Sequence, residues 1–114
     1  MMNQYEAVFI VTPVLSDDQV KETVQKFKKI LSDGGAEILL EENWGLRKLA
    51  YPIKHKTTGF YNLIEFKAPG ALIDRLEIEY RRDEKIIRFL TVKMDKYAVA
   101  FSDKRKKMKK EETN

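Results

Sequence analysis

The chain has 114 residues, a formal net charge of +4, 43% hydrophobic residues and 35% charged residues, which is typical of one folded domain and excludes a disordered chain. It contains no cysteine, so a disulfide framework and thiolate chemistry are excluded, and its longest apolar run, residues 7–11, is too short to span a bilayer. The start of the chain lacks the basic and apolar segments of a signal peptide, so we expect a cytoplasmic protein.

The first predicted elements are a strand and a helix. Residues 5–11, YEAVFIV, are rich in β-branched and aromatic residues and predict a strand. Residues 16–19, SDDQ, predict a capping box, in which Ser16 accepts a hydrogen bond from a first-turn N–H and Gln19 reaches back. Apolar residues then recur at helical spacing until the glycine pair at 34–35 ends the helix.

The middle of the chain predicts a β-hairpin. A long strand over residues 36–53 is expected to bend at Gly45, because glycine inside a strand favours a bend or a bulge. Residues 54–58, KHKTT, are predicted to form the loop, and residues 59–67 the second strand. Leu49 is expected to be a core residue.

A second helix is predicted to begin after Pro69 and Gly70, and the last strand to cover residues 86–94. The order is then β-α-β-β-α-β. Two right-handed split βαβ units in one sheet give an α+β, ferredoxin-like fold, a four-stranded antiparallel sheet with both helices on one face. We assign residues 1–96 to this domain and residues 97–114 to a C-terminal extension.

The first strand indicates how the open face of this sheet is used. Alternate residues of a strand point to opposite faces of the sheet, and both sets in this strand are largely apolar. The set on the open face, which we call its phase, holds Glu6, Val8 and Ile10. A strand with one solvated face is expected to alternate apolar and polar residues. A protein partner, a second copy of the chain or stacked bases could therefore cover this face, and Glu6, Val8 and Ile10 are the residues expected to contact a protein partner. Val8 and Ile10 have no obvious internal cover. The alternative is that two exposed aliphatic residues are ordinary surface.

The stretch from Trp44 to Tyr61 combines basic and aromatic residues and contains no Asp or Glu. Cations at strand ends and in a hairpin loop can reach phosphate groups without disturbing a core. The residues expected to contact RNA here are Arg47, Lys48, Lys54, His55 and Lys56. Trp44 and Tyr51 each have an apolar body and a polar end, which suits a protein interface. The alternative for the loop lysines is an ordinary solvated charge.

A second basic group is formed in the sequence by Arg81, Arg82 and Arg88, which are also expected to contact RNA. The alternative is that the nearby acids Asp83 and Glu84 pair with some of them. These two acids fall in the predicted turn between helix and strand, which they are expected to cap or solvate.

The C-terminal extension carries the excess charge of the chain. Residues 1–103 hold equal numbers of cations and anions, whereas the segment KRKKMKK at residues 104–110 holds six cations. Such a segment cannot bury apolar area, so it is expected to be ordered only by a polyanion such as RNA, and the alternative is a solubilising tail. The tail residues expected to bind RNA are Lys104, Arg105, Lys106 and Lys107. Before the tail, Tyr97 and Phe101 suit docking onto a protein partner.

Enzymatic chemistry is not supported by any residue pattern. His55 is the single histidine, and without cysteine it has no partner for a zinc site. Glu41 and Glu42 are adjacent in a strand, so their carboxylates point to opposite sides. Ser16 is explained as a helix cap rather than as a nucleophile. We therefore expect no enzyme, no metal and no cofactor.

The ferredoxin-like order also invites comparison with RNA-recognition motifs, which stack bases on aromatic residues of the third strand. The best alignment is TGFYNLIE, residues 58–65, which places Asn62 and Glu65 where that signature needs aromatic rings. A base-stacking sheet is therefore disfavoured, and RNA contact by Lys and Arg side chains remains open.

Four segments together resemble the bacterial small-subunit ribosomal protein S6 family: YE at 5–6, WGLRKLAYPI at 44–53, TGFYNLIEF at 58–66 and YRRDEKIIRFLTVK at 80–93. The resemblance covers about residues 3–101. It implies a ferredoxin-like fold, no enzymatic activity and a place in the platform of the small subunit. It also implies joint binding to small-subunit ribosomal RNA with a second protein, S18. The competing class is a homodimeric regulatory or ligand-binding domain of the same fold, which has no use for an acid-free basic hairpin.

Overall fold

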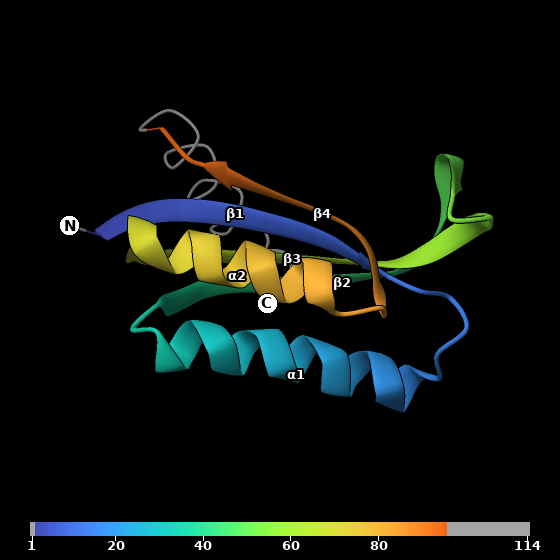
Figure 1. The fold of residues 1–114 in the computed structure, drawn as a ribbon, viewed down its shortest axis with the longest axis horizontal. Coiled ribbons are helices and arrows are strands. Elements are labelled where there is room, and N and C mark those ends of the chain that lie inside the picture. Colours follow the sequence, from blue (N-terminus) through green and yellow to red (C-terminus); the bar gives the residue numbers. More distant parts are fainter. Residues whose placement is uncertain (1, 96–114) are drawn as a thin grey trace, which may run out of the picture.

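The computed structural model describes residues 2–95 of the chain. Its elements are β1 (Met2–Val11), α1 (Asp17–Asp33), β2 (Glu37–Ile53), β3 (Lys56–Pro69), α2 (Gly70–Arg82) and β4 (Ile86–Lys93) (Figure 1). The strands form one antiparallel sheet in the order β2-β3-β1-β4, which confirms the predicted ferredoxin-like fold. None of the helices in the described residues is long and apolar enough to cross a membrane.

Both helices cover the same face of the sheet, as predicted (Figure 1). Residues 5, 7, 9 and 11 of β1 point toward the helices and are buried in the main core. Aromatic rings fill the centre of this layer. The ring of Phe27 on α1 lies 4.4 Å from that of Tyr80 on α2, and both contact the ring of Phe9. The main core thus joins the two helices to the central strand β1.

The ends of α1 are those that the sequence predicts. The backbone N–H of Gln19 donates to Oγ of Ser16 at 3.3 Å, and the N–H of Ser16 donates to Oε1 of Gln19 at 2.9 Å, which completes the capping box. At the other end, the N–H of Gly34 donates to the carbonyl of Ile30 at 3.1 Å. The next residue, Gly35, has a φ of +87°, a conformation that only glycine adopts without strain.

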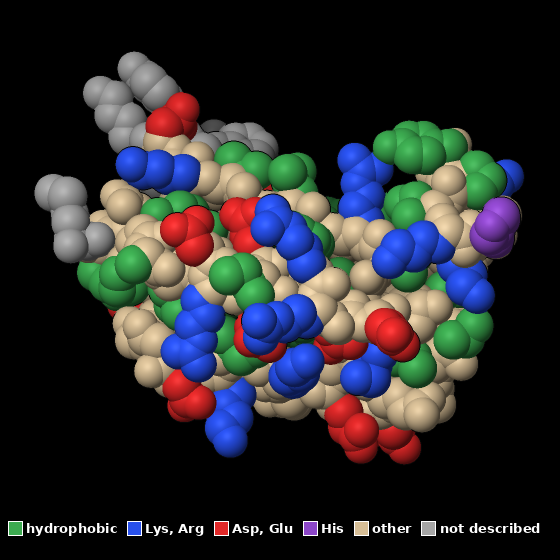
Figure 2. Space-filling view, in the orientation of Figure 1, with side chains coloured by type: hydrophobic (Ala, Val, Ile, Leu, Met, Phe, Trp, Pro, Cys, Tyr) green, Lys and Arg blue, Asp and Glu red, His purple; other side chains and the backbone are tan. Residues whose placement is uncertain are grey.

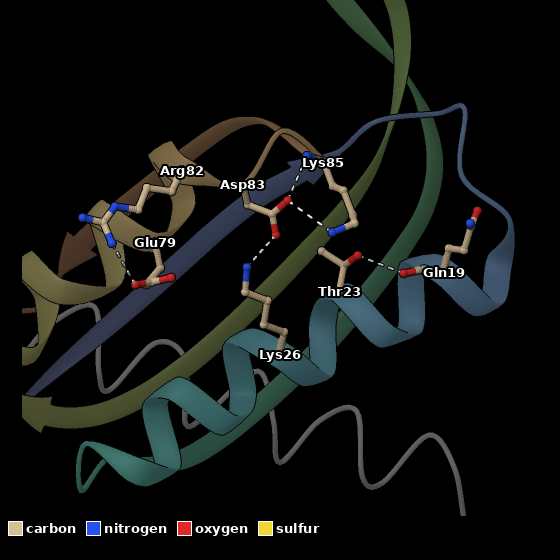
Figure 3. A network of polar contacts seen from close by, with 7 residues as sticks. All are labelled: Gln19, Thr23, Lys26, Glu79, Arg82, Asp83 and Lys85. Atoms are coloured by element: carbon tan, nitrogen blue, oxygen red, sulfur yellow. Dashed lines mark hydrogen bonds and ion pairs between the residues drawn. The ribbon is translucent and has the colours of Figure 1, made fainter.

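The corner between α2 and β4 is built around the buried carboxylate of Asp83 (Figure 3). Lys26 of α1 donates to this carboxylate at 3.0 Å, and the backbone N–H of Lys85 donates to it at 2.9 Å. Burial by itself raises the pKa of Asp83, but the hydrogen bonds and charges of Lys85 and Lys26 outweigh it and hold the pKa below its ordinary value. The expectation that Asp83 caps this turn is confirmed, and the carboxylate also ties α1 to the corner.

The hairpin between β2 and β3 differs from its prediction. The predicted loop over residues 54–58 is wrong, because only Lys54 and His55 form the turn and β3 begins at Lys56. Lys54 has a φ of 49° and His55 a φ of 66°. Left-handed conformations at both positions of a two-residue turn match the twist of the strands, so the pair Ile53–Lys56 closes directly on the turn.

The long strand β2 bends where the sequence predicts. Gly45 has a φ of +75°, and the β2–β3 register shifts between Asn43 and Gly45. A larger irregularity follows. Lys48 pairs with Thr58, but the next pair is Ile53 with Lys56, so residues 49–52 have no ladder partner. We call residues 49–57 the arm. In Figure 1 the green end of this hairpin projects beyond the rest of the sheet and turns away from the helices.

Candidate RNA and protein interface

The open face of the sheet carries an apolar groove. The register places Val8 between Leu63 and Leu90, and Ile10 between Tyr61 and Arg88. A groove of about 220 Å³ lies among these strands and is lined by Val8, Ile10, Tyr61, Arg88, Phe89 and Leu90. Leu90 is 60% exposed, and Val92 beyond it is also exposed. The groove therefore opens onto aliphatic side chains that nothing in residues 2–95 covers.

The expectation that Ile10 lacks an internal cover is wrong. Its side chain is only 6% exposed, because Leu49 from the arm and Ile87 from β4 pack around it. Leu49 is itself 6% exposed, which confirms its predicted place in a core. The arm thus covers one end of the open face. Val8 is half-buried, and it lies at the boundary between the covered end and the exposed groove.

The two aromatic residues expected at a protein interface flank this open face. The ring of Trp44 stacks on that of Tyr61, with centroids 6.3 Å apart, and its indole N–H donates to the carboxylate of Glu42 at 2.8 Å. Tyr51 is exposed on the arm, and its hydroxyl accepts a hydrogen bond of 2.6 Å from Nη1 of Arg88. Both side chains are thus held in place while much of their surface stays in contact with solvent.

The cations of the hairpin gather at its projecting end. In Figure 2, blue Lys and Arg side chains surround the purple histidine, His55, at the right-hand edge of the molecule. Arg47, Lys48, Lys54 and His55 are exposed and Lys56 is half-buried. Arg47 donates to the carbonyl of Trp44 at 3.0 Å. Within residues 2–95, none of these cations forms an ion pair.

The second basic group of the sequence is divided by the fold. Arg81 pairs with Glu77 at 3.7 Å and Arg82 with Glu79 at 4.0 Å along α2, so their ionic partners are helix residues rather than Asp83 or Glu84. Arg88 lies on the other side of the sheet, with its guanidinium over the ring of Tyr51. The interpretation of these arginines as one group is therefore wrong, and only Arg88 adjoins the hairpin.

Some expected site residues lie outside the described part of the chain. They are Tyr97, Phe101, Lys104, Arg105, Lys106 and Lys107. Within the described part, no cluster of histidine and acidic residues could hold a metal ion.

The sequence reasoning missed the part that β4 plays in the open face. Arg88, Leu90 and Val92 share the phase that faces away from the helices, whereas Phe89 and Thr91 pair with helix-facing residues of β1. The sequence shows that these three residues alternate along one strand and so share a face, but the sheet register is needed to place Leu90 beside Val8. Tyr61 reaches the groove for the same reason, because it pairs with Ile10.

Comparison with known proteins agrees with this architecture. A family described as Ribosomal protein S6 matches residues 4–93. The chain is 67% identical over 108 residues to small ribosomal subunit protein bS6 of Phocaeicola vulgatus, and 65% identical over 108 residues to that of Bacteroides thetaiotaomicron, with 95% of each chain covered in both cases. The crystal structure of 30S ribosomal protein S6 from Thermotoga maritima superposes with a TM-score of 0.81 at 30% identity, covering 96% of this chain and 99% of that one.

The family match covers most of the chain, and the relatives are similar in length to it. It accounts for the predicted fold, for the resemblance of the four sequence segments and for a place in the bacterial ribosome, which is cytoplasmic. The chain therefore belongs to the ribosomal protein S6 family and is a structural component of the small ribosomal subunit rather than an enzyme.

Proposed function

We propose that this chain binds small-subunit ribosomal RNA in the platform together with ribosomal protein S18, and that it uses two adjoining surfaces to do so. The hairpin cations contact RNA, and the open face of the sheet contacts the protein. The observation that carries the proposal is that an apolar groove meets, at the arm, a cluster of cations that form no ion pair within residues 2–95.

The hairpin suits RNA because most of its cations are exposed and none of them is neutralised by an ion pair within residues 2–95. Lys54 and His55 sit at the tip, where no part of the described fold stands between them and a large ligand. Each contact between a cation and a phosphate group increases the affinity, because it releases counterions from the RNA. Arg47 and Lys48 extend the basic surface along β2.

The open face suits a protein because its exposed side chains are aliphatic and contiguous. Val8 and Leu90 line the groove on neighbouring strands, and the exposed Val92 follows on β4, so a partner that covers both the groove and this end of β4 removes all three from water. RNA has little apolar surface to offer them. Trp44 and Tyr51 add rings of the kind that anchor protein interfaces.

The C-terminal extension would add to both contacts. We propose that Tyr97 and Phe101 dock onto the protein partner and that Lys104, Arg105, Lys106 and Lys107 contact RNA. This part of the proposal is supported by composition and charge. Because residues 1–103 are neutral overall, long-range attraction to RNA is weak, and we expect the protein partner to supply much of the binding energy.

The proposal is tested by titrating this chain alone, S18 alone and the two together onto a platform RNA fragment. We expect feeble binding by each protein alone and much tighter binding by the pair. The matched variants replace Arg47, Lys54 and Lys56 together with Ala, and, as a control away from the hairpin, Lys21, Lys29 and Arg75, which are equally basic and exposed on the helices. Only the hairpin variant should lose RNA affinity. Full-strength binding by this chain alone, or equal losses in both variants, contradicts the proposal.

A further inference from the structure

Arg88 joins two parts of the open face that the backbone ladder does not join. It lies in β4, whereas Tyr51 lies in the arm, beyond the point where β2 stops pairing with β3. Nη1 of Arg88 donates to the Tyr51 hydroxyl at 2.6 Å, and its Cζ lies 5.7 Å from the centroid of the Tyr51 ring. Within residues 2–95, this is the one side-chain hydrogen bond that connects the arm to β4.

The arm needs such a connection because few of its residues form ladder pairs in the sheet. Between the pair Lys48–Thr58 and the pair Ile53–Lys56, four residues of β2 stand opposite a single residue of β3. The arm is therefore held to the domain by the packing of Leu49 and by the contact of Tyr51 with Arg88. The direction in which the tip points depends on both.

We infer that Arg88 is a positioning residue for the basic tip rather than a direct RNA contact. This inference rests on the proposed function, since it assumes that Lys54, His55 and Lys56 meet RNA. The guanidinium is already engaged by the hydroxyl and by the face of the Tyr51 ring, a geometry that a lysine ammonium does not reproduce. Arg88 also lines the apolar groove, so a protein seated there touches the residue that holds the arm.

The positioning role is testable on the free chain. Because the chain has no cysteine, spin labels can be placed at Lys54→Cys on the tip and Asp74→Cys on the exposed surface of α2 without other changes. We expect one narrow distance distribution with wild-type Arg88 and Tyr51, and a broader one in Tyr51→Phe and in Arg88→Lys. Identical distributions in all three proteins overturn the inference.

The second measurement separates positioning from direct contact by RNA affinity in the presence of the protein partner. If Arg88 acts through Tyr51, then Arg88→Lys and Tyr51→Phe each weaken binding by roughly 3- to 10-fold, within the range expected for the net loss of one ordinary hydrogen bond. The double variant then binds RNA no less tightly than the single variant that has the lower affinity, because both changes break the same interaction. The dependence of log affinity on log salt stays unchanged.

A direct phosphate contact gives the opposite pattern. Arg88→Lys then binds like the wild type, Tyr51→Phe has no effect, and Arg88→Gln lowers the salt slope by about one. That result overturns the inference. If this chain and S18, both in their wild-type form, do not bind platform RNA together, the proposed function fails. The distance measurement on the free chain still decides whether Arg88 positions the arm.

Discussion

The two faces of this sheet are covered by different means. Toward the helices, α1 and α2 bury Tyr5, Ala7, Phe9 and Val11 of β1, and aromatic rings from three elements fill the space. On the open face, the arm is the only cover among residues 2–95, and it reaches Ile10 but leaves Leu90 exposed. The strand β1 therefore contributes to a buried core on one face and to a partly exposed apolar surface on the other. From this comparison we expect most of the stability to reside on the helix side, and we propose that the open face is available for assembly.

Replacing leucines with alanine compares how much each face contributes to the free energy of unfolding, and the largest loss is expected on the helix side. Leu76 of α2 is fully buried, so Leu76→Ala should lower the free energy of unfolding by about 2–5 kcal/mol. Leu90→Ala on the open face should change it by less than about 1 kcal/mol, because most of that side chain is already in water. Urea denaturation of both variants measures the difference. Equal losses would show that the open face carries as much of the fold as the core.

Leu49→Ala tests how much the arm contributes. The residue is buried, but among residues 2–95 its cluster has only two other buried members, Ile10 and Ile87, with Ile53 and Tyr61 partly buried at its edge, so the site can relax toward solvent. We expect a loss near the low end for a buried leucine, about 2 kcal/mol. Amide hydrogen exchange should then rise in the arm more than in α1. A uniform rise along the chain would contradict the view that the arm is a separate cover.

Asp83 stabilises the helix side by a polar contact, and its effect should depend on pH. Replacing it with Asn keeps its size but weakens the bonds from Lys26 and Lys85, at a cost of roughly 1–3 kcal/mol near neutral pH. Because the pKa of Asp83 is lower in the folded state than its ordinary value of 3.8, its stabilisation is present above that value. It is lost as the pH falls through the lower, folded-state pKa.

Denaturation of wild type and Asp83→Asn across pH 2–7 tests this linkage. The two stabilities should converge only at the acid end. A constant difference across the range would show that the charge of Asp83 contributes nothing.

The smallest effect is expected from the hydroxyl of Tyr80 in the main core. It is buried, and within residues 2–95 it has no hydrogen-bond partner. Burial also raises the pKa of this phenol far above its ordinary range, so the group stays neutral. Tyr80→Phe keeps the ring contacts with Phe27 and Phe9, and should leave stability unchanged or raise it by up to about 1 kcal/mol. A clear loss of thermal stability would show that the hydroxyl is satisfied in solution, for example by a buried water.

The sequence predicted most of the fold because its signals are local. The capping box at Ser16, the glycine stop at 34–35 and the bend at Gly45 each require particular residues at particular backbone positions, and all three are confirmed. The hairpin loop was predicted too long because Lys54 and His55 adopt left-handed conformations that usually belong to Gly, Asn or Asp.

The candidate site was harder to predict because it depends on contacts between distant segments. Leu49 covers Ile10 only because β2 leaves the ladder after Lys48, and no local pattern encodes that path. The separation of Arg88 from Arg81 and Arg82 likewise follows from the register of β4. The sequence nevertheless predicted the hairpin as a candidate site, because residues 44–61 combine basic and aromatic residues without Asp or Glu.

The most direct test of the account compares two exposed aliphatic residues on opposite sides of the molecule. Leu90 lies on the open face and Ile78 on α2, and each can be replaced by Glu without opening a core. Calorimetric titration with S18 should show binding weakened by at least roughly tenfold in Leu90→Glu, because a carboxylate is forced into an apolar interface, and no change in Ile78→Glu. Unchanged affinity in Leu90→Glu, or equal losses in both variants, would contradict the claim that the open face is the protein-binding surface.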